Sequence, residues 1–467
     1  MTDFSFDLVV LGGGSGGYAA ALRAAELGAR AVIIEQDLLG GTCLHRGCVP
    51  TKALLHTAEV ADSVRHAASV GVIASLGGID AGAALEWRRA LVGGKHRGLT
   101  SLVKTRGIEL VSGRGSLTSV DGKPAIAVGD DRYVGNDVVI ATGASSRSIP
   151  GIEFTSRILD SEAALALDTV PARVAVLGGG VIGVEFASAW RSLGAEVTII
   201  EALDHLIANE DPSSRTALEK AYQRRGIALE LGARVTAVTE GADGVSVTID
   251  RAGSPATINA DIVLVAVGRG PNTSGLGLEE AGIVIDRGFV QTDEKLRTAA
   301  PHVWAVGDIV PGPQLAHRGF RHGIFVAETI AGRTPAPLDD ALFPRVTYST
   351  PEIASIGMTE PQAREKHAER VVVQEVSLAG NAKSEIVSAG SPVRAGSVKI
   401  VALENGPILG VHLVGDRVGE LITEGQVAVA WEARADDLAP LIHAHPSQSE
   451  ALGEAFLALA GSPLHTM

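Results

Sequence analysis

Two cysteines, Cys43 and Cys48, are the only ones among the 467 residues, and four residues separate them. They exclude a disulfide-rich scaffold and a four-thiolate metal site built from this chain alone. Residues 49–55, with Pro50 near the start, predict a helix, and a helix N-terminus favours a thiolate. A disulfide closing so small a loop would stabilise a fold by about 2 kcal/mol. We therefore interpret the pair as a redox switch; two buried structural thiols are the alternative, against which the polar neighbours and glycines argue.

Two copies of one glycine pattern indicate the elements that would position this chemistry. Gly-x-Gly-x-x-Gly begins at Gly12 and again at Gly178, each time after a short apolar run and before an Ala-rich helical stretch. A second apolar run then ends in an acid, Glu35 or Glu201, at the same offset (35 − 12 = 201 − 178 = 23). Glycines allow a tight turn and close approach of a pyrophosphate, and the acid accepts hydrogen bonds from a ribose diol. The pattern predicts two dinucleotide-binding βαβ units.

The remaining pattern predicts layered α/β structure followed by a different C-terminal part. Three more apolar runs that end near glycines, at 138–143, 262–268 and 303–308, are typical of buried parallel strands. Residues 397–403 and 408–414 predict a hairpin, and 419–431 and 450–460 predict helices. Residues 145–150 and 332–337 have the Pro- and Gly-rich composition of linkers.

Composition and charge limit the partners and the compartment. The net charge of −14 argues against a general nucleic-acid binder. The N-terminus lacks the basic cluster of a signal peptide, and the most apolar stretch, Val174–Trp190, is shorter than the roughly 20 residues that span a bilayer. We expect a soluble cytoplasmic protein, in which a close cysteine pair is more often catalytic than structural.

Residues 40–54, Gly-Gly-Thr-Cys-Leu-His-Arg-Gly-Cys-Val-Pro-Thr-Lys-Ala-Leu, resemble the active-site segment of the flavin-dependent pyridine nucleotide-disulfide oxidoreductases. The similarity is greatest to the dihydrolipoamide dehydrogenase branch, and motifs in family order run from Gly12 to Glu450. The resemblance implies FAD in the first fingerprint, a nicotinamide nucleotide in the second, no metal, and a homodimer. The implied fold is α/β, with two dinucleotide-binding (Rossmann-like) domains and an α+β C-terminal dimerisation domain. The expected division is 1–150 (FAD-binding), 151–275 (NAD-binding), 276–343 (return to the FAD or central domain) and 344–467 (interface).

The resemblance also assigns nucleotide contacts. Lys52 should lie near the flavin and pair with Glu185, and the helix opened by residues 314–317 should face the flavin with its N-terminus. The implied FAD-binding residues are Gly12, Gly14, Gly17, Glu35, Thr42, Lys52, Gly115, Thr142, Asp308 and Ala316. The implied NAD-binding residues are Gly178, Gly180, Ile182, Gly183, Glu201, Val235 and Gly268.

The C-terminal segment 443–450 supplies the implied acid–base group. Taken alone, His445 would be a surface histidine at a helix start. By the resemblance it is the acid–base histidine, oriented by Glu450 and presented to the disulfide of the partner subunit, so the dimer would form through residues after about 343. Cys43 would be the interchange thiol and Cys48 the thiol against the flavin. With Lys52 and Glu185, these four residues make up the implied catalytic set.

The expected activity is oxidation of dihydrolipoyl groups by NAD⁺, as part of 2-oxoacid dehydrogenase complexes. NAD is favoured over NADP because Glu201 and Asp204 would repel a 2′-phosphate. The lipoyl group would come from a lipoyl-bearing acyltransferase, another lipoyl protein or a free substrate. Two alternatives stay open: an NAD(P)H-dependent reductase of another small disulfide, such as mycothione or glutathione disulfide, and a nucleotide-binding redox sensor without turnover.

Overall fold

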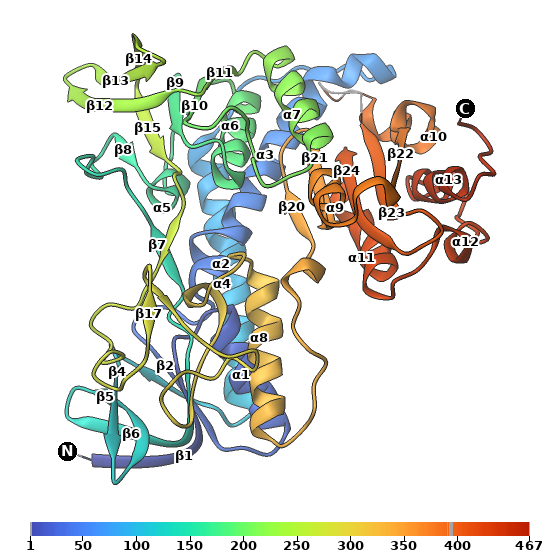
Figure 1. Cartoon of the computed structure of the whole chain (residues 1–467). Coiled ribbons are helices and arrows are strands. Elements are labelled where there is room, and N and C mark those ends of the chain that lie inside the picture. The colour runs from blue at the N-terminus through green and yellow to red at the C-terminus, as the bar shows by residue number, and fades with distance from the viewer. Residues whose placement is uncertain (1, 390, 392–395, 467) are drawn as a thin grey trace. The chain divides into compact units, whose positions relative to one another are not determined.

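The computed structural model describes residues 2–389, 391 and 396–466 (Figure 1). Contacts divide the chain into two compact units, each assembled from three segments that are distant in sequence. Unit 1 consists of Met1–Pro50, Glu86–Arg147 and Arg269–Asp340, and unit 2 of Thr51–Leu85, Ser148–Gly268 and Ala341–Met467. Each fingerprint therefore belongs to a different unit. The four-part division from the sequence stays a prediction.

Unit 1 is built on a sheet of order β3-β2-β1-β6-β5-β4, with β19 pairing with β6. The pairs among β1, β2, β3, β6 and β19 are parallel, and β4, β5 and β6 pair antiparallel. The runs Leu8–Leu11 and Ile33–Ile34 are buried in its core because the parallel strands are covered by helices. The strands are β1 Thr2–Leu11, β2 Ala31–Glu35, β3 Glu109–Ser112, β4 Ser116–Val120, β5 Lys123–Val128, β6 Asp131–Ile140 and β19 Val303–Ala305.

Helices α1 (Ser15–Glu26) and α8 (Ala316–Ile330) pack side by side in unit 1. Glycines make this close approach possible, because a Cβ on Gly323 of α8 would lie 2.2 Å from the Gly16 carbonyl oxygen of α1. The other elements of unit 1 are α2 Gly41–His45, β7 Ala144–Ser146, β16 Arg269–Pro271, β17 Ile285–Asp286, β18 Phe289–Val290 and the 3₁₀ turn η2 Gly307–Ile309. Two long helices, α3 Cys48–His66 and α4 Ala81–Thr105, each begin in a segment of one unit and end in a segment of the other.

Unit 2 contains a second parallel sheet of order β11-β10-β9-β15-β8, beside an antiparallel sheet β12-β13-β14. Helix α6 (Val181–Leu193) follows β9 and returns the chain to β10, which is the expected βαβ crossover. The other bounds are β8 Ile158–Leu159, α5 Ser161–Leu165, β9 Arg173–Leu177, β10 Glu196–Glu201, α7 Pro212–Arg224, β11 Ala228–Leu231, β12 Arg234–Gly241, β13 Gly244–Arg251, β14 Ser254–Ala260 and β15 Ile262–Val265.

The C-terminal part of unit 2 is a five-stranded antiparallel sheet of order β20-β21-β24-β23-β22, with helices packed on it. Its largest buried side chain is Phe456 of α13. The strands are β20 Arg345–Thr347, β21 Glu352–Gly357, β22 Val371–Ser377, β23 Ser397–Leu403 and β24 Ile408–Gly415. The helices are α9 Glu360–His367, α10 Ala382–Ser388, α11 Ile422–Ala430, α12 Ala435–Leu438 and α13 Glu450–Leu459, with short 3₁₀ turns at 340–342, 368–370, 378–380 and 418–421. A further 3₁₀ turn, at 67–70, follows α3.

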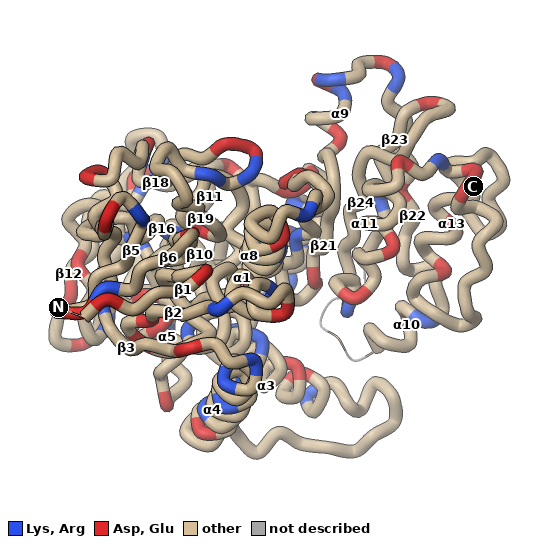
Figure 2. The backbone as a smooth tube through the Cα atoms, turned by 90° about the horizontal axis from the view of Figure 1, so that it is seen from below, with Lys and Arg blue, Asp and Glu red and all other residues tan. Residues whose placement is uncertain are grey.

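The predicted α/β fold is confirmed, with two differences in detail. The predicted linker near 145 contains β7, which pairs antiparallel with β16. The predicted helix 419–431 is a 3₁₀ turn, Val418–Leu421, followed by α11, and the Gly419 N–H of the turn donates to Glu352 Oε2 (2.9 Å). Within the described residues, no helix is both long and apolar enough to cross a bilayer. Acidic and basic residues are interspersed along the described chain (Figure 2).

Candidate nucleotide and redox site

The first glycine loop has a shape that only glycine allows and an opening where a ligand can approach. Gly12 has a φ of +103°, and a Cβ there would lie 2.4 Å from the Ala141 carbonyl oxygen. A Cβ on Gly17 would lie 1.9 Å from the Gly12 carbonyl oxygen. At Gly14, the N-cap of α1, the space is open to 4 Å and no side chain caps the helix. The N–H groups of this helix end fit the pyrophosphate of a dinucleotide.

The second loop repeats these features in unit 2. Gly178 has a φ of +107°, and a Cβ there would lie 2.5 Å from the Ala266 carbonyl oxygen. A Cβ on Gly183 would lie 2.0 Å from the Gly178 carbonyl oxygen, whereas Gly180 again has open space and caps α6 without a side-chain hydrogen bond. The two loops therefore share the same backbone geometry, and each leaves helix N-terminal N–H groups that would fit an anion.

The two acids at the ends of β2 and β10 hold the loops in the same way. Glu35 Oε2 accepts from the Gly13 N–H and Glu201 Oε2 from the Gly179 N–H, both at 2.6 Å. The second oxygen of each carboxylate accepts at 2.8 Å from the N–H two residues further on. A carboxylate has about four acceptor positions, so each acid can still accept from a ribose hydroxyl. The acids thus support their glycine loops as well as offering a ribose contact.

Several predicted FAD residues gather at the strand ends of unit 1. Thr142 Oγ1 donates to the Asn272 carbonyl oxygen (2.6 Å), and Asn272 Nδ2 donates to the Thr142 carbonyl oxygen (3.0 Å). Arg269 donates to Thr42 Oγ1 (3.4 Å) and to the Ala144 carbonyl oxygen. The sequence reasoning missed Arg269 and Asn272, although their position just after the apolar run ending at Gly268 was a usable signal.

Asp308 and Ala316 also belong to unit 1. Asp308 lies in η2, where burial raises the pKa of its carboxyl while the positive charges of Arg269 and Arg318 act to lower it. Ala316 is the first residue of α8, as the resemblance implied. Gly115 precedes β4, where a Cβ would lie 2.6 Å from the side chains of Leu11 and Ile126. A residue larger than glycine would not fit at position 115, because the backbone there packs directly against these core side chains.

The remaining predicted nucleotide residues lie in unit 2. Ile182 is the second residue of α6, directly at the second glycine loop. Gly268 follows β15 with a φ of +111°. Val235 is on β12, at an irregularity in its pairing with β13, and packs half-buried against the core beside that sheet. Their contacts with a nucleotide stay predictions.

The cysteine segment lies against the first glycine loop. A Cβ on Gly41, the first residue of α2, would lie 2.7 Å from Cα of Gly14. Cys43 on this short helix is half-buried, and Cys48, the first residue of α3, is exposed. Burial, followed by the charges of both cysteines, raises the pKa of Tyr18 to about 12. Tyr18, on α1, is thus a neighbour of the pair that the sequence reasoning missed.

Two hydrogen bonds and an ion pair anchor the residues between the cysteines. His45 Nε2 bonds to the Leu39 carbonyl oxygen (2.9 Å), and His96 Nδ1 of α4 bonds to the same oxygen (3.0 Å). The two rings meet edge to face, with centroids 5.1 Å apart. Arg46 forms an ion pair with Asp37. The basic residues of this segment therefore hold it to the chain that follows β2.

In unit 2, Lys52 of α3 and Glu185 of α6 form the ion pair that the resemblance implied. Lys52 Nζ donates to both carboxylate oxygens, at 2.9 and 2.8 Å. Glu185 also accepts from the Tyr348 N–H (2.9 Å), and Lys52 Nζ lies 4.6 Å from the centre of the Tyr348 ring. Tyr348 is a third member of this group that the sequence did not indicate.

His445 and Glu450 form a second predicted pair in unit 2. His445 Nδ1 bonds to Glu450 Oε1 (2.8 Å), and the Ser447 N–H donates to Glu450 Oε2 (2.7 Å). The Ser447 N–H and the bond to His445 hold the pKa of Glu450 below its usual value. The His445 side chain is 77% exposed. With Nδ1 bonded, Nε2 is the nitrogen available for proton transfer with an incoming group.

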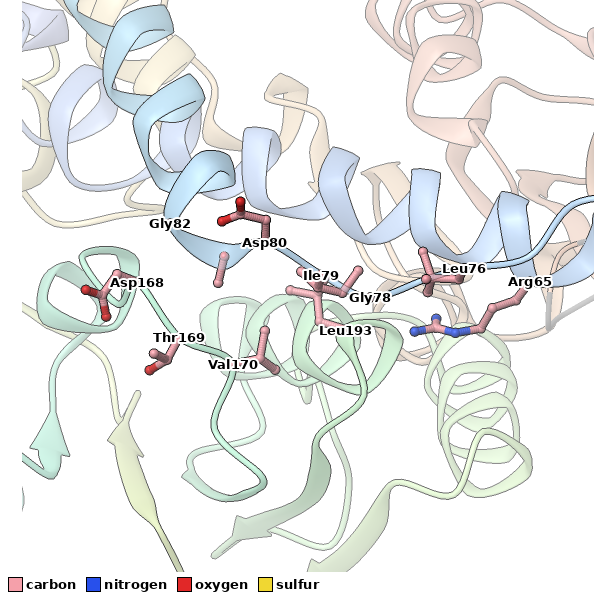
Figure 3. Close-up of a pocket in the computed structure, with 12 residues that line it drawn as sticks. Arg65, Leu76, Gly78, Ile79, Asp80, Gly82, Asp168, Thr169, Val170 and Leu193 are labelled. Atoms are coloured by element: carbon pink, nitrogen blue, oxygen red, sulfur yellow. The ribbon is translucent and has the colours of Figure 1, made fainter.

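A cavity of about 550 Å³ in unit 2 lies outside these groups (Figure 3). The residues before α4, including Ile79 and Asp80, line one side, and Asp168 to Val170 line another. Arg65 lines its edge, but its guanidinium is held by Asp62 (2.8 Å) and the Ser192 carbonyl oxygen. None of the predicted site residues lines this cavity.

Two dinucleotide-type glycine loops and a Cys-x4-Cys segment on one chain define a nucleotide-dependent thiol–disulfide oxidoreductase. Residues 6–323 match the family model described as pyridine nucleotide-disulphide oxidoreductase, and residues 343–456 match the dimerisation domain of the same family. The protein belongs to the pyridine nucleotide-disulphide oxidoreductase family. It is therefore an oxidoreductase with FAD and a pyridine nucleotide as cofactors, and it carries a dimerisation domain.

Curated relatives cover nearly the whole chain. The protein is 36% identical to a dihydrolipoyl dehydrogenase of Bacillus subtilis over 98% of this chain and 99% of the relative. It is 38% identical to dihydrolipoyl dehydrogenase 3 of Pseudomonas aeruginosa, over 98% of each. Among solved structures, LpdA of Mycobacterium tuberculosis superposes with a TM-score of 0.90 at 28% identity, over 98% of this chain and 100% of that one. The HOCl-induced flavoprotein disulfide reductase RclA of Escherichia coli gives 0.85 at 28% identity, over 96% and 99%.

Proposed function

We propose that the protein is a dihydrolipoyl dehydrogenase, which oxidises dihydrolipoyl groups to the lipoyl disulfide with NAD⁺. The observation that carries the proposal is the exposed His445, bonded through Nδ1 to Glu450, on a chain that also holds the Cys43 and Cys48 pair. The full-length relatives that bear this name support it. A redox sensor without turnover would need neither the acid–base pair nor its exposure.

The thiol chemistry is an exchange between two disulfides. One dihydrolipoyl thiol transfers its proton to Nε2 of His445, and its thiolate attacks Cys43 Sγ of the Cys43–Cys48 disulfide. The Cys43–Cys48 bond breaks, and Cys48 leaves as a thiolate. The second substrate thiol then attacks the substrate sulfur bonded to Cys43, and the bond between that sulfur and Cys43 breaks. Its proton passes to the departing Cys43 sulfur, so that lipoyl disulfide is released and the cysteine pair is reduced by two electrons. Glu450 fixes the tautomer of His445 and stabilises its protonated form.

The two glycine loops hold the cofactors in this proposal. The loop from Gly12 to Gly17, with Glu35, holds FAD, and the loop from Gly178 to Gly183, with Glu201, holds NAD. Bound FAD supplies the two-electron relay between the cysteine pair and the nicotinamide. The carboxylates of Glu201 and Asp204 disfavour a 2′-phosphate, which supports NAD over NADP.

The exposure of His445 and the dimerisation domain at 343–456 support a homodimer. In this dimer, His445 of the partner subunit serves the cysteine pair of the first copy. The substrate group is carried by a lipoyl-bearing acyltransferase or another lipoyl protein in the cytoplasm.

The test is a steady-state assay of the purified, FAD-loaded protein. We expect NAD⁺ reduction with dihydrolipoamide and NADH oxidation with lipoamide. Rates with glutathione disulfide and mycothione should be at least about 100-fold lower in kcat/KM. A higher rate with either of these disulfides, or with NADPH than with NADH, would contradict the proposal.

A further inference from the structure

A second histidine–carboxylate pair lies two residues before His445. His443 Nε2 bonds to Glu424 Oε1 of α11 at 2.8 Å. The side chain of His443 is 12% exposed, whereas that of His445 is 77% exposed. The two imidazoles therefore have different surroundings: the His443 ring is mostly covered and held by Glu424, and the His445 ring is presented to solvent. The proposed function uses the exposed ring and leaves the His443 ring without a role.

Helix α13 is shaped to receive the His443 ring. A Cβ on Gly453 would lie 2.5 Å from His443 Nδ1 and 2.8 Å from Cε1, so any larger residue would displace the imidazole. Gly453 is three residues after Glu450, and residues at this spacing share one face of a helix. One turn of α13 thus holds the His443 ring through Gly453 and the His445 ring through Glu450. The charge of His443 also contributes to lowering the pKa of Glu450.

The chain after His445 has anchors of its own. The Ser447 N–H bonds to Glu450 Oε2, Asn381 Nδ2 donates to the Ser447 carbonyl oxygen (3.0 Å), and Gln448 Nε2 donates to the Asp416 carbonyl oxygen (2.8 Å). The His443–Glu424 bond is the corresponding anchor on the chain before His445. An exposed side chain in an irregular segment needs such anchors on both sides to keep one geometry.

We propose that His443 and Glu424 are positioning residues for His445: their hydrogen bond and the packing of the His443 ring on Gly453 hold the segment that presents the acid–base imidazole. Neither residue touches the substrate in this scheme. The proposal rests on the proposed function for its kinetic readout. The charged groups that interact with His443 are Glu424 from α11 and Glu450 from α13.

The kinetic test compares two electron acceptors in the FAD-loaded enzyme. His443→Ala should lower kcat with dihydrolipoamide about 10- to 100-fold. NADH oxidation by ferricyanide should stay within about twofold of the wild type, because this acceptor needs neither the cysteine pair nor His445. His443→Gln should recover most of the lost turnover, since its amide can still donate to Glu424. His465→Ala is the matched control, because His465 is a 75% exposed histidine that pairs with Glu454 of α13.

Gly453→Ala tests the packing without changing either polar group. It should reproduce the loss of His443→Ala with dihydrolipoamide. Equal loss with ferricyanide, or dihydrolipoamide turnover within twofold of the wild type for His443→Ala, would overturn the proposal.

An NMR measurement separates this inference from the proposed function. The His445 imidazole signal, assigned by its disappearance in His445→Gln, should change its chemical shift in His443→Ala. It should stay in place in His465→Ala. An unchanged His445 signal would refute the positioning role, whereas absence of lipoamide turnover in the wild type would refute the proposed function alone.

Discussion

Lys52 Nζ donates to both carboxylate oxygens of Glu185, at 2.9 and 2.8 Å, across 133 residues of sequence. Glu185 is 3% exposed, and Lys52 is the cation that compensates its charge. The pair ties α3, which begins at Cys48, to α6, which begins at the second glycine loop. If the cation is removed, the buried carboxylate still carries its desolvation cost but has no compensating charge. Mutation of Lys52 should therefore lower the stability of the protein.

Lys52→Met should lower the free energy of unfolding by about 2–3 kcal/mol, because Glu185 would be left buried with one N–H donor. Lys52 is about one-third exposed, so we expect a loss at the lower end of the range for buried pairs. Urea unfolding measures it, and Lys366→Met, at an exposed lysine of α9, should change stability by less than about 0.5 kcal/mol. In a double-mutant cycle with Glu185→Met, a coupling energy near zero would contradict this account.

Gly14→Ala and Gly180→Ala should fold normally and lose nucleotide binding, because an added Cβ meets no protein atom within 4 Å at either position. The open space is where we place the pyrophosphates, so the methyl group would occupy ligand volume. We expect Gly14→Ala to be purified with less than about half of the wild-type FAD, seen in the visible absorbance. Gly180→Ala should retain FAD and show a KM for NADH at least about 10-fold higher. If Gly14→Ala is purified with the full wild-type FAD content, the assignment of FAD to this loop is contradicted.

Glu35→Ala and Glu201→Ala form a matched pair, because the two acids make identical backbone contacts. Each loses hydrogen bonds to a charged acceptor worth about 1.5–3 kcal/mol, which corresponds to roughly 10- to 100-fold in affinity. Glu201→Ala should raise the KM for NADH, and Glu35→Ala should weaken retention of FAD during dialysis. If instead Glu35→Ala raised the KM for NADH and Glu201→Ala weakened retention of FAD, the assignment of the two loops would be reversed.

Glu352 should make the protein less stable as pH rises from about 4.5 to about 7. Burial raises the pKa of its carboxyl to about 7, from a usual value of 4.5, although the Gly419 N–H opposes the shift. The folded state therefore holds a proton that the unfolded state releases between about pH 4.5 and 7. Stability is greatest below pH 4.5 with respect to this group and falls by up to about 3 kcal/mol as pH rises to 7 and above.

Glu352→Gln should abolish that part of the pH dependence while keeping an acceptor for Gly419. The measurement is urea unfolding at several pH values between 4.5 and 8, compared with the wild type. Glu369→Gln, at an exposed acid of the same unit, is the control and should keep the wild-type slope. Parallel curves for the wild type and Glu352→Gln would show that the carboxyl does not titrate in this range.

Local signals in the sequence were sufficient to predict the elements around the two glycine loops. The strands 31–35 and 196–201 end at the predicted acids, and the strand 173–177 ends at the second glycine pattern, because each is a short apolar run ended by glycine or an acid. The glycines at 12, 17, 178 and 183 were also identifiable, because no other residue fits the turn. The predicted helix 419–431 was wrong at its start, where the structure has a 3₁₀ turn with the Gly419 N–H bonded to the distant carboxylate of Glu352.

By itself, the sequence determined the chemistry-bearing residue types: one cysteine pair, two glycine loops with their acids, and a histidine followed five residues later by Glu450. These depend on spacing along the chain and on the steric limits of the backbone. Tertiary structure alone decided which groups surround them. Tyr18 beside the cysteines, Tyr348 at Lys52 and Glu424 at His443 come from other elements, and no local pattern specifies a contact that depends on how helices and sheets pack.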